Sequence, residues 1–253
     1  MSIAHSSLEV LNTPYLQGKA IPAYQPIFAE IPSVSVVIAA LNEEENLPHV
    51  LPKIPSWVDE VIIVDGGSTD ETIAVAQKLN PDVVIVNQLG KGKGDALRLG
   101  FEAATKDIIV ALDADGSTAP EEIPAFVGAL VSGADYVKGS RFLQGGGTAD
   151  MTLLRKLGNL GLVQLVTLFY GGKFSDLCYG YNAFWRRTLP LLDLDADGFE
   201  IETLMNIRAL KAQLKVAEVA SFEAERIHGE SNLNTFKDGW RVLKTILSEK
   251  RRG

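Results

Sequence analysis

The sequence predicts an α/β fold in which a mostly parallel central sheet is flanked by helices. The length of 253 residues and the hydrophobic fraction of 46% suffice for one large α/β domain with a substantial core. Four short runs rich in Val and Ile are each followed by a polar or glycine-containing turn. Such strand–loop–helix units are joined by right-handed crossovers, so we expect parallel strands with ligands bound beyond their carboxyl ends.

The predicted elements follow this order along the chain. The four strands are expected in SVSVVIAA (33–40), DEVIIVD (59–65), DVVIVNQ (82–88) and DIIVALD (107–113). The last three strands lead to segments of helical periodicity that end near residues 80, 104 and 133. After about residue 140 the pattern changes to a short strand, a glycine-rich loop and apolar segments. A helix at 200–213 and a strand at 215–224 follow.

The expected domain organisation has three parts. Residues 1–32 contain scattered Pro and Gly without a sustained period, which indicates an N-terminal arm. Residues 33–235 form the main domain, with a first half to residue 117 and a second half from 118 to 235. In the final segment, 236–253, apolar residues recur at helical spacing among basic ones, which predicts an amphipathic basic helix.

Composition excludes several classes of protein. A net charge of −8 and a pI near 5.0 argue against nucleic acid as the main partner, because duplex binding requires many cationic contacts with phosphates. The only cysteine, Cys178, cannot form an intramolecular disulfide and is expected as a small buried apolar residue. We find no secretory signal and no apolar stretch of the roughly 20 residues that a spanning helix needs, so the cytoplasm is expected.

Charged side chains gather at the predicted strand ends. Carboxylates occur at Glu43, Asp65, Asp113 and Asp115, and the loop GKGKGD adds Lys93. A nucleoside diphosphate needs positive charge, which a lysine in a glycine loop and a divalent cation on aspartates supply. Mg²⁺ and Mn²⁺ prefer such oxygen ligands. Each motif alone is also typical of an ordinary turn, but their occurrence on successive strand ends predicts a nucleotide diphosphate site.

Two other phosphate-binding motifs do not fit. The segment GKGKGDALRLG lacks the G-x-G-x-x-G order, and it follows the third strand where the dinucleotide fingerprint follows the first. The segment GGKF lacks the Ser or Thr that follows the lysine of a Walker A motif.

Several motifs resemble one known family, the inverting family 2 glycosyltransferases of GT-A fold. Within it, the chain is similar to the dolichyl or polyprenyl phosphate mannosyl and glucosyl transferases. The motifs, which span about residues 34–235, are VVIAALNEEENL, EVIIVDGGSTDET, GKGKGDALRLGF, IIVALDADGS, GSRF, DLCYGYNAFWRR and RIHGESNLN. The resemblance implies transfer of a hexose from a UDP-glucose or GDP-mannose type of donor, with Mg²⁺ or Mn²⁺, most readily to polyprenyl phosphate.

The resemblance also implies roles for individual residues. Asp113 and Asp115 correspond to the D-x-D motif that binds ribose and metal, with Asp115 as the direct ligand. Asp65 recognises the base and Lys93 lies near the nucleotide. The remaining implied contacts are Ala40, Leu41, Asn42, Glu43 and Ala114 for the nucleotide sugar, and Arg141, Arg155 and Arg226 for phosphates. The chain has Ala39 and Gly66 where the family often has Pro and a second Asp, which leaves UDP and GDP both open.

Three further residues carry open roles. His228, in a polar loop, is either a third metal ligand or a phosphate contact, or a surface histidine without a role. Glu200 and Glu202 begin a predicted helix, where acids stabilise the helix dipole. If the acceptor is a hydroxyl compound, one of them acts as general base; a phosphate acceptor is already an anion and needs none.

Alternatives of other kinds are distinguishable from the sequence. A nucleotidyltransferase is expected to carry a glycine-rich pyrophosphate loop after the first strand, where this chain has AALNEEENL. A non-catalytic nucleotide-sugar binding protein does not require Asp113, Asp115 and Lys93 together, so the presence of all three argues against this class. Apolar and basic residues in 155–173 and in the last helix are compatible with core packing, and also with peripheral binding to a membrane surface that presents a lipid phosphate.

Overall fold

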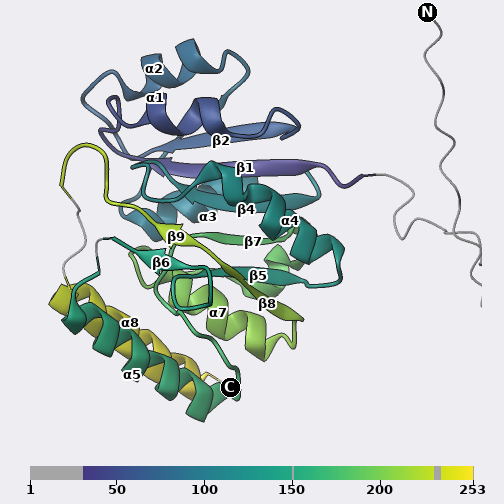
Figure 1. Cartoon of the computed structure of the whole chain (residues 1–253), viewed down its shortest axis with the longest axis vertical. Coiled ribbons are helices and arrows are strands. Elements are labelled where there is room, and N and C mark those ends of the chain that lie inside the picture. The colour runs from purple at the N-terminus through teal and green to yellow at the C-terminus, as the bar shows by residue number, and fades with distance from the viewer. Residues whose placement is uncertain (1–30, 150, 231–234, 253) are drawn as a thin grey trace, which may run out of the picture. The chain divides into compact units, whose positions relative to one another are not determined.

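A seven-stranded sheet forms the centre of the computed structural model, which describes residues 31–149, 151–230 and 235–252 (Figure 1). Its strand order is β3-β2-β1-β4-β7-β5-β8. The strands are β1 (Val34–Ala40), β2 (Glu60–Asp65), β3 (Val84–Asn87), β4 (Ile108–Asp113), β5 (Tyr136–Ser140), β7 (Asn182–Trp185) and β8 (Val216–Ala220). Two short strands, β6 (Gly147–Thr148) and β9 (Phe222–Glu223), form a separate parallel pair.

The register of the parallel strands brings the predicted site residues to one edge of the sheet. Ala39 of β1 lies opposite Asp113 of β4, and Ala40 lies opposite Asp65 of β2. The mostly parallel sheet is therefore confirmed. One strand of this sheet was not predicted: β7 runs antiparallel between β4 and β5. It inserts the second half of the chain directly beside β4, the strand that ends at Asp113.

Helices cover both faces of the sheet. They are α1 (Leu47–Val50), α2 (Thr72–Leu79), α3 (Lys93–Ala103), α4 (Ile123–Val131), α5 (Leu153–Tyr170), α6 (Leu189–Leu192), α7 (Ile201–Lys211) and α8 (Thr235–Arg251). Helices α3 and α7 share one core cluster with strand residues such as Val37 and Ile109. Helix α4 packs on the opposite face, where Phe126 stacks on Tyr181 at a centroid distance of 4.1 Å.

The last helix packs together with α5 beside the second half of the sheet (Figure 1). Val242 and Ile246 of α8 share a buried cluster with Val166 of α5 and Ile207 of α7. The described residues from Pro32 onward form one compact unit, and α8 is an integral part of it. The predicted N-terminal arm, up to residue 30, lies outside the described residues. No helix among the described residues is long and apolar enough to cross a membrane.

Candidate active site

A cavity of about 880 Å³ opens at the carboxyl ends of β1, β2 and β4. One part is polar and is formed by the strand ends, the loop before α3 and the segment after β9. The other part is mainly apolar and is formed by α5 and α8. The predicted site residues that line it are Ala40, Leu41, Glu43, Lys93, Asp113, Ala114, Asp115, Arg141, Arg155, Glu202 and Arg226. The cavity thus joins a charged region to an apolar one.

Lys93 connects the two halves of the chain at the cavity floor. Its Nζ lies 2.6 Å from Asp113 Oδ1 and 2.9 Å from Glu202 Oε1. Burial alone lowers the pKa of Lys93, but the two carboxylates outweigh burial and raise that pKa above its usual value. Lys93 is therefore a permanent cation at the end of β4.

Three glycines allow this arrangement. A Cβ on Gly94 would lie 2.3 Å from the carbonyl oxygen of Ala196, so the loop before α3 packs backbone to backbone against the segment before α7. Gly92 has a φ of 94°, which favours glycine. A Cβ on Gly180 would lie 2.8 Å from Lys93 Nζ and 2.6 Å from Asp113 Oδ2. The alternate glycines of GKGKG thus position a lysine rather than form a dinucleotide loop.

Asp115 belongs to a second ion-pair cluster. Its Oδ1 accepts hydrogen bonds from the Ser117 amide at 2.9 Å and the Ser117 hydroxyl at 2.6 Å, which fixes the turn after β4. Its Oδ2 lies 3.4 Å from Arg226 Nε. The other two Arg226 nitrogens donate to the carboxylate of Glu43 at 3.0 and 3.2 Å. Burial raises the pKa of Glu43, although hydrogen bonds from Asn46 and Arg226 oppose the rise.

The structure does not bring His228 together with the two aspartates. Its side chain is exposed and lies outside the cavity lining, with its ring 5.7 Å from that of His49. Its backbone amide donates to Asn46 Oδ1 at 2.9 Å. No group of three or more His, Cys, Asp or Glu side chains among the described residues could hold a metal ion. The three-ligand set Asp113, Asp115 and His228 is thus not formed, because the loop hydrogen bonds turn His228 toward α1.

Asp65 and Asn42 hold neighbouring loops together rather than line the cavity. The buried carboxylate of Asp65 accepts hydrogen bonds from the backbone amides of Gly67 and Ser68 at 3.1 and 3.2 Å. Asn42, with a φ of 56°, accepts from the Thr69 amide at 2.8 Å. These contacts fix the loops after β1 and β2 against each other. Recognition of the base by Asp65 stays a prediction, and in this geometry its carboxylate is engaged by its own turn.

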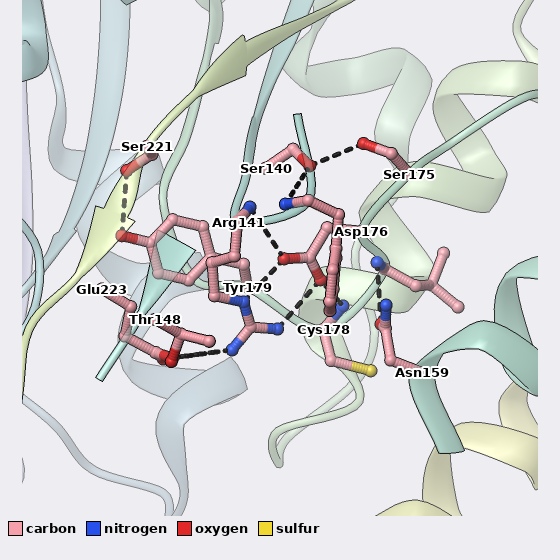
Figure 2. A network of polar contacts seen from close by, with 12 residues as sticks. Ser140, Arg141, Thr148, Asn159, Ser175, Asp176, Cys178, Tyr179, Ser221 and Glu223 are labelled. Carbon is pink, nitrogen blue, oxygen red and sulfur yellow. Dashed lines mark hydrogen bonds and ion pairs between the residues drawn. The ribbon is translucent and has the colours of Figure 1, made fainter. Parts of the chain in front are cut away.

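Arg141 lies in a buried network of acidic partners (Figure 2). Its Nε and Nη2 donate to the two carboxylate oxygens of Asp176 at 2.6 and 2.9 Å, and its Nη1 donates to Glu223 at 3.0 Å. Its guanidinium also lies 5.0 Å from the ring centroid of Tyr179. Burial lowers the pKa of Arg141, but Asp176 and Glu223 outweigh it and raise that pKa. In this state Arg141 stabilises the turn after β5 rather than presenting free donors to a phosphate.

The remaining predicted residues divide between the two ends of the cavity. Arg155 lines the apolar end, and its Nε donates to Thr235 Oγ1 at 3.3 Å across α5 and α8. Glu200 lies outside the lining: one carboxylate oxygen accepts from the Gly198 amide at 3.3 Å, and the other is buried without a hydrogen-bond partner among the described residues. Of the two glutamates predicted as alternatives for a base, only Glu202 reaches the cavity.

Some lining residues were not predicted. Gln88 and Phe199 carry no motif that marks them, and only the topology brings them to the strand ends. Cys178 was expected to be buried; instead it is exposed and lines the cavity, because it lies in the irregular segment before β7. Gly180 did carry a sequence signal, since a Gly between two Tyr residues marks a close backbone approach.

The geometry agrees with comparisons to known proteins. A model of the family described as Glycosyl transferase family 2 matches residues 35–189, more than half of the chain and all four strand ends of the site. The chain belongs to glycosyl transferase family 2. The predicted family is thus confirmed, and the protein is a glycosyltransferase of GT-A fold.

Two curated relatives of this glycosyltransferase are named for lipid phosphates. A dolichol-phosphate mannosyltransferase of Pyrococcus furiosus is 33% identical over 209 residues, which cover 79% of this chain and 59% of that protein. A polyprenol monophosphomannose synthase of Mycolicibacterium smegmatis is 32% identical over 212 residues, which cover 79% of this chain and 80% of that protein. The glycosyltransferase therefore spans little more than half of the first relative and most of the second.

A solved structure shares the fold. The glucosyl-3-phosphoglycerate synthase of Mycobacterium tuberculosis, in complex with Mn²⁺, UDP and glucosyl-3-phosphoglycerate, superposes with a TM-score of 0.66 at 26% identity. The superposition covers 86% of this glycosyltransferase and 79% of that chain. This neighbour holds a nucleoside diphosphate and a divalent metal, the two ligands that the strand ends of this chain predict.

Proposed function

We propose that this glycosyltransferase transfers a hexose from a nucleoside diphosphate sugar to polyprenyl phosphate, with a divalent cation and with inversion at the anomeric carbon. The observation that carries the proposal is the continuity of one cavity from the ion pairs at the strand ends to the apolar surfaces of α5 and α8. A sugar nucleotide is charged, whereas a polyprenyl phosphate has one charged end and a long apolar chain.

The charged region supports binding of a diphosphate. Lys93 and Arg226 each contact an aspartate of β4 or its turn, and both line the cavity. A diphosphate that enters there offers these cations a second set of oxygens, so the carboxylates of Asp113 and Asp115 become available for a cation. Two carboxylates fit Mg²⁺ or Mn²⁺, which keep positions for phosphate oxygens and water. When bound, the metal ion supplies positive charge beside the departing diphosphate.

The state of the glutamates supports an anionic acceptor. Glu202 is almost fully buried, and its carboxylate is already engaged in an ion pair with Lys93 at 2.9 Å. Glu200 lies outside the cavity lining. A phosphate oxygen attacks the anomeric carbon without losing a proton, and the bond from that carbon to the nucleoside diphosphate breaks in the same in-line displacement. A cation beside the acceptor phosphate favours its approach to the donor, and the presence of Arg155 in the cavity lining supports this role for it.

The apolar region supports a lipid acceptor at a membrane surface. Large apolar side chains are exposed along α5 and α8, among them Leu153, Leu154, Leu157, Leu160, Phe236 and Trp240. Both acidic residues of the two described helices, Asp238 and Glu249, are buried. The exposed charges are therefore basic, a combination that favours the interface of an anionic bilayer and peripheral attachment of the enzyme.

The test is product formation with Mn²⁺ and a panel of UDP and GDP sugars, each with and without a short polyprenyl phosphate. We expect release of the nucleoside diphosphate that requires the lipid phosphate, and a sugar product whose anomeric configuration, read by NMR, is inverted. No turnover with any donor would overturn the donor assignment.

A soluble acceptor is the second candidate. Its support is the structural neighbour, which is named for a phosphorylated hydroxy acid. In that case Glu202, the only one of the two glutamates at the cavity, acts as base. Turnover with a soluble hydroxyl acceptor, abolished in Glu202→Gln and absent with the lipid phosphate, would favour this candidate.

A further inference from the structure

The side-chain amide of Gln88 has a fixed orientation at the edge of the cavity. Its Nε2 donates to the carbonyl oxygen of Gly92 at 2.8 Å and to Asp95 Oδ2 at 3.0 Å. Both partners only accept hydrogen bonds, so the nitrogen and oxygen of this amide cannot be exchanged. Asp95 is buried and is itself held by Arg98. Gln88 therefore presents its carbonyl oxygen, and not its amino group, to any ligand.

That oxygen faces the gap left by Gly66. A Cβ on Gly66 would lie 3.3 Å from Gln88 Oε1 and 3.4 Å from the carbonyl oxygen of Ala40. Gly66, Ala40 and Gln88 all line the cavity at the ends of β1, β2 and β3. Among the described residues, no hydrogen bond reaches Gln88 Oε1. The adjacent Asp65, whose carboxylate accepts from two backbone amides, is not part of the cavity lining, whereas Gln88 is.

We infer that Gln88 reads the nucleobase of the donor by accepting a hydrogen bond from a ring N–H, namely N3–H of uracil or N1–H of guanine. This inference rests on the proposed nucleotide donor and adds its base specificity. In cytosine and adenine the ring nitrogen at the same edge is an acceptor, which repels a carbonyl oxygen. Gly66 leaves this oxygen uncovered, because a Cβ there would lie only 3.3 Å from it.

The experiment is a thermodynamic cycle in which one change is made in the protein, at Gln88, and the other in the ligand, at the ring nitrogen of the base. Isothermal titration calorimetry with Mg²⁺ first compares UDP, GDP, CDP and ADP on the full chain, and we expect UDP or GDP to bind most tightly. The preferred nucleotide is then compared with its analogue methylated at the ring nitrogen, N3-methyl-UDP or N1-methyl-GDP. The same pair is titrated into Gln88→Met, which keeps the side-chain length but removes the acceptor.

We expect methylation to weaken binding to the wild type about 5- to 10-fold more than binding to Gln88→Met, the loss expected for one neutral hydrogen bond. If the variant displaces the loop that carries Lys93, the affinities for the methylated and unmethylated nucleotides fall by the same factor. Such a loss therefore cancels in the ratio of the two affinities. Gly66→Ala, which crowds the same oxygen, is expected to lower the preference for the unmethylated nucleotide. Gln77→Met, at an exposed position of α2, serves as the matched control and should behave as the wild type.

Each other outcome is decisive. Equal losses on methylation in the wild type and in Gln88→Met would overturn the role of Gln88 while leaving the donor assignment intact. A preference for CDP or ADP would overturn it as well. If none of the four nucleoside diphosphates binds, the proposed function itself fails and the inference fails with it.

Discussion

At the scale of single residues, the cavity is organised by cations that each hold an acidic partner. Lys93 holds Asp113 and Glu202, and Arg226 holds Glu43 and approaches Asp115. In such pairs each cation occupies carboxylate oxygens until a ligand with its own negative charge competes for it. For this reason we expect Asp113 and Asp115 to change partners when a substrate binds, rather than only to stabilise a turn.

The first prediction concerns Asp115→Asn. The amide keeps the size of the side chain but removes the negative charge, so we expect metal-dependent turnover to fall at least about 100-fold, in keeping with loss of an electrostatic catalytic contact. The measurement is initial rate against Mn²⁺ concentration. Asp197→Asn, in an exposed side chain outside the cavity lining, is the control and should retain its rate. An unchanged Mn²⁺ response in Asp115→Asn would remove Asp115 from the metal site.

The second prediction concerns the pH dependence of stability at Lys138. This lysine of β5 is fully buried, and its Nζ donates to the carbonyl oxygen of Tyr179. Burial lowers its pKa to about 8, although Asp176 and Glu202 oppose the change. Between pH 8 and the normal lysine pKa of about 10.4, the unfolded chain therefore binds more protons than the folded one, and this group makes unfolding less favourable as pH rises.

We expect the free energy of unfolding of the wild type, relative to Lys138→Met, to increase by about 2 kcal/mol from pH 8 to pH 10. Urea unfolding at several pH values measures the difference, and the comparison cancels the titration of tyrosines shared by both proteins. Lys78→Met on α2 is the control, since Lys78 is exposed and should show no such trend. A constant difference across this range would contradict the lowered pKa.

At the scale of secondary structure, α8 has two distinct surfaces. Val242 and Ile246 pack into the cluster with α5 and α7, and buried Glu249 pairs with Arg208. On its exposed side, Phe236 and Trp240 lie beside the cavity mouth. Deletion of the helix would remove core contacts together with the exposed surface. Point variants of the exposed residues are therefore the informative way to test membrane attachment.

The third prediction concerns these exposed aromatic residues. The double variant Phe236→Ser and Trp240→Ser loses the apolar contacts with the bilayer, so we expect its affinity for anionic lipid vesicles to fall about tenfold or more. Sedimentation with vesicles containing phosphatidylglycerol measures the affinity. Trp57→Ser, partly exposed and outside the cavity lining, is the control. Equal sedimentation of the double variant and the wild type would exclude this surface as the membrane contact.

At the scale of the whole molecule, the sequence predicted the first half well and the second half incompletely. Strands β2 and β4 are apolar runs that end in aspartates, and the largely apolar β1 is followed closely by Glu43, so local pattern alone identified both the strands and the site edge. Strand β7 has only four residues within a Gly- and Tyr-rich segment. Its place in the sheet depends on pairing with β4 and β5, which no local pattern reveals.

The same distinction applies to the site. Asp113, Asp115 and Lys93 were predicted because each follows a strand or a glycine loop, and the structure gathers them around one cavity. Which of Glu200 and Glu202 faces that cavity depends on where α7 begins and how it packs. The direction of His228 depends on loop hydrogen bonds to Asn46. Such tertiary contacts, rather than residue type, decide which of the candidate side chains line the cavity.

The position of β7 has a consequence for biosynthesis. In the sheet, β5 pairs with β7 and β8, both of which follow it in the chain, and the free side of β4 is also covered by β7. A ribosome that has made the first four parallel strands therefore exposes an open strand edge until residue 185 has emerged. Nascent chains that stall before residue 185, and fragments that end there, keep this edge open. We therefore expect them to aggregate more readily than the complete sheet and to depend more on chaperones.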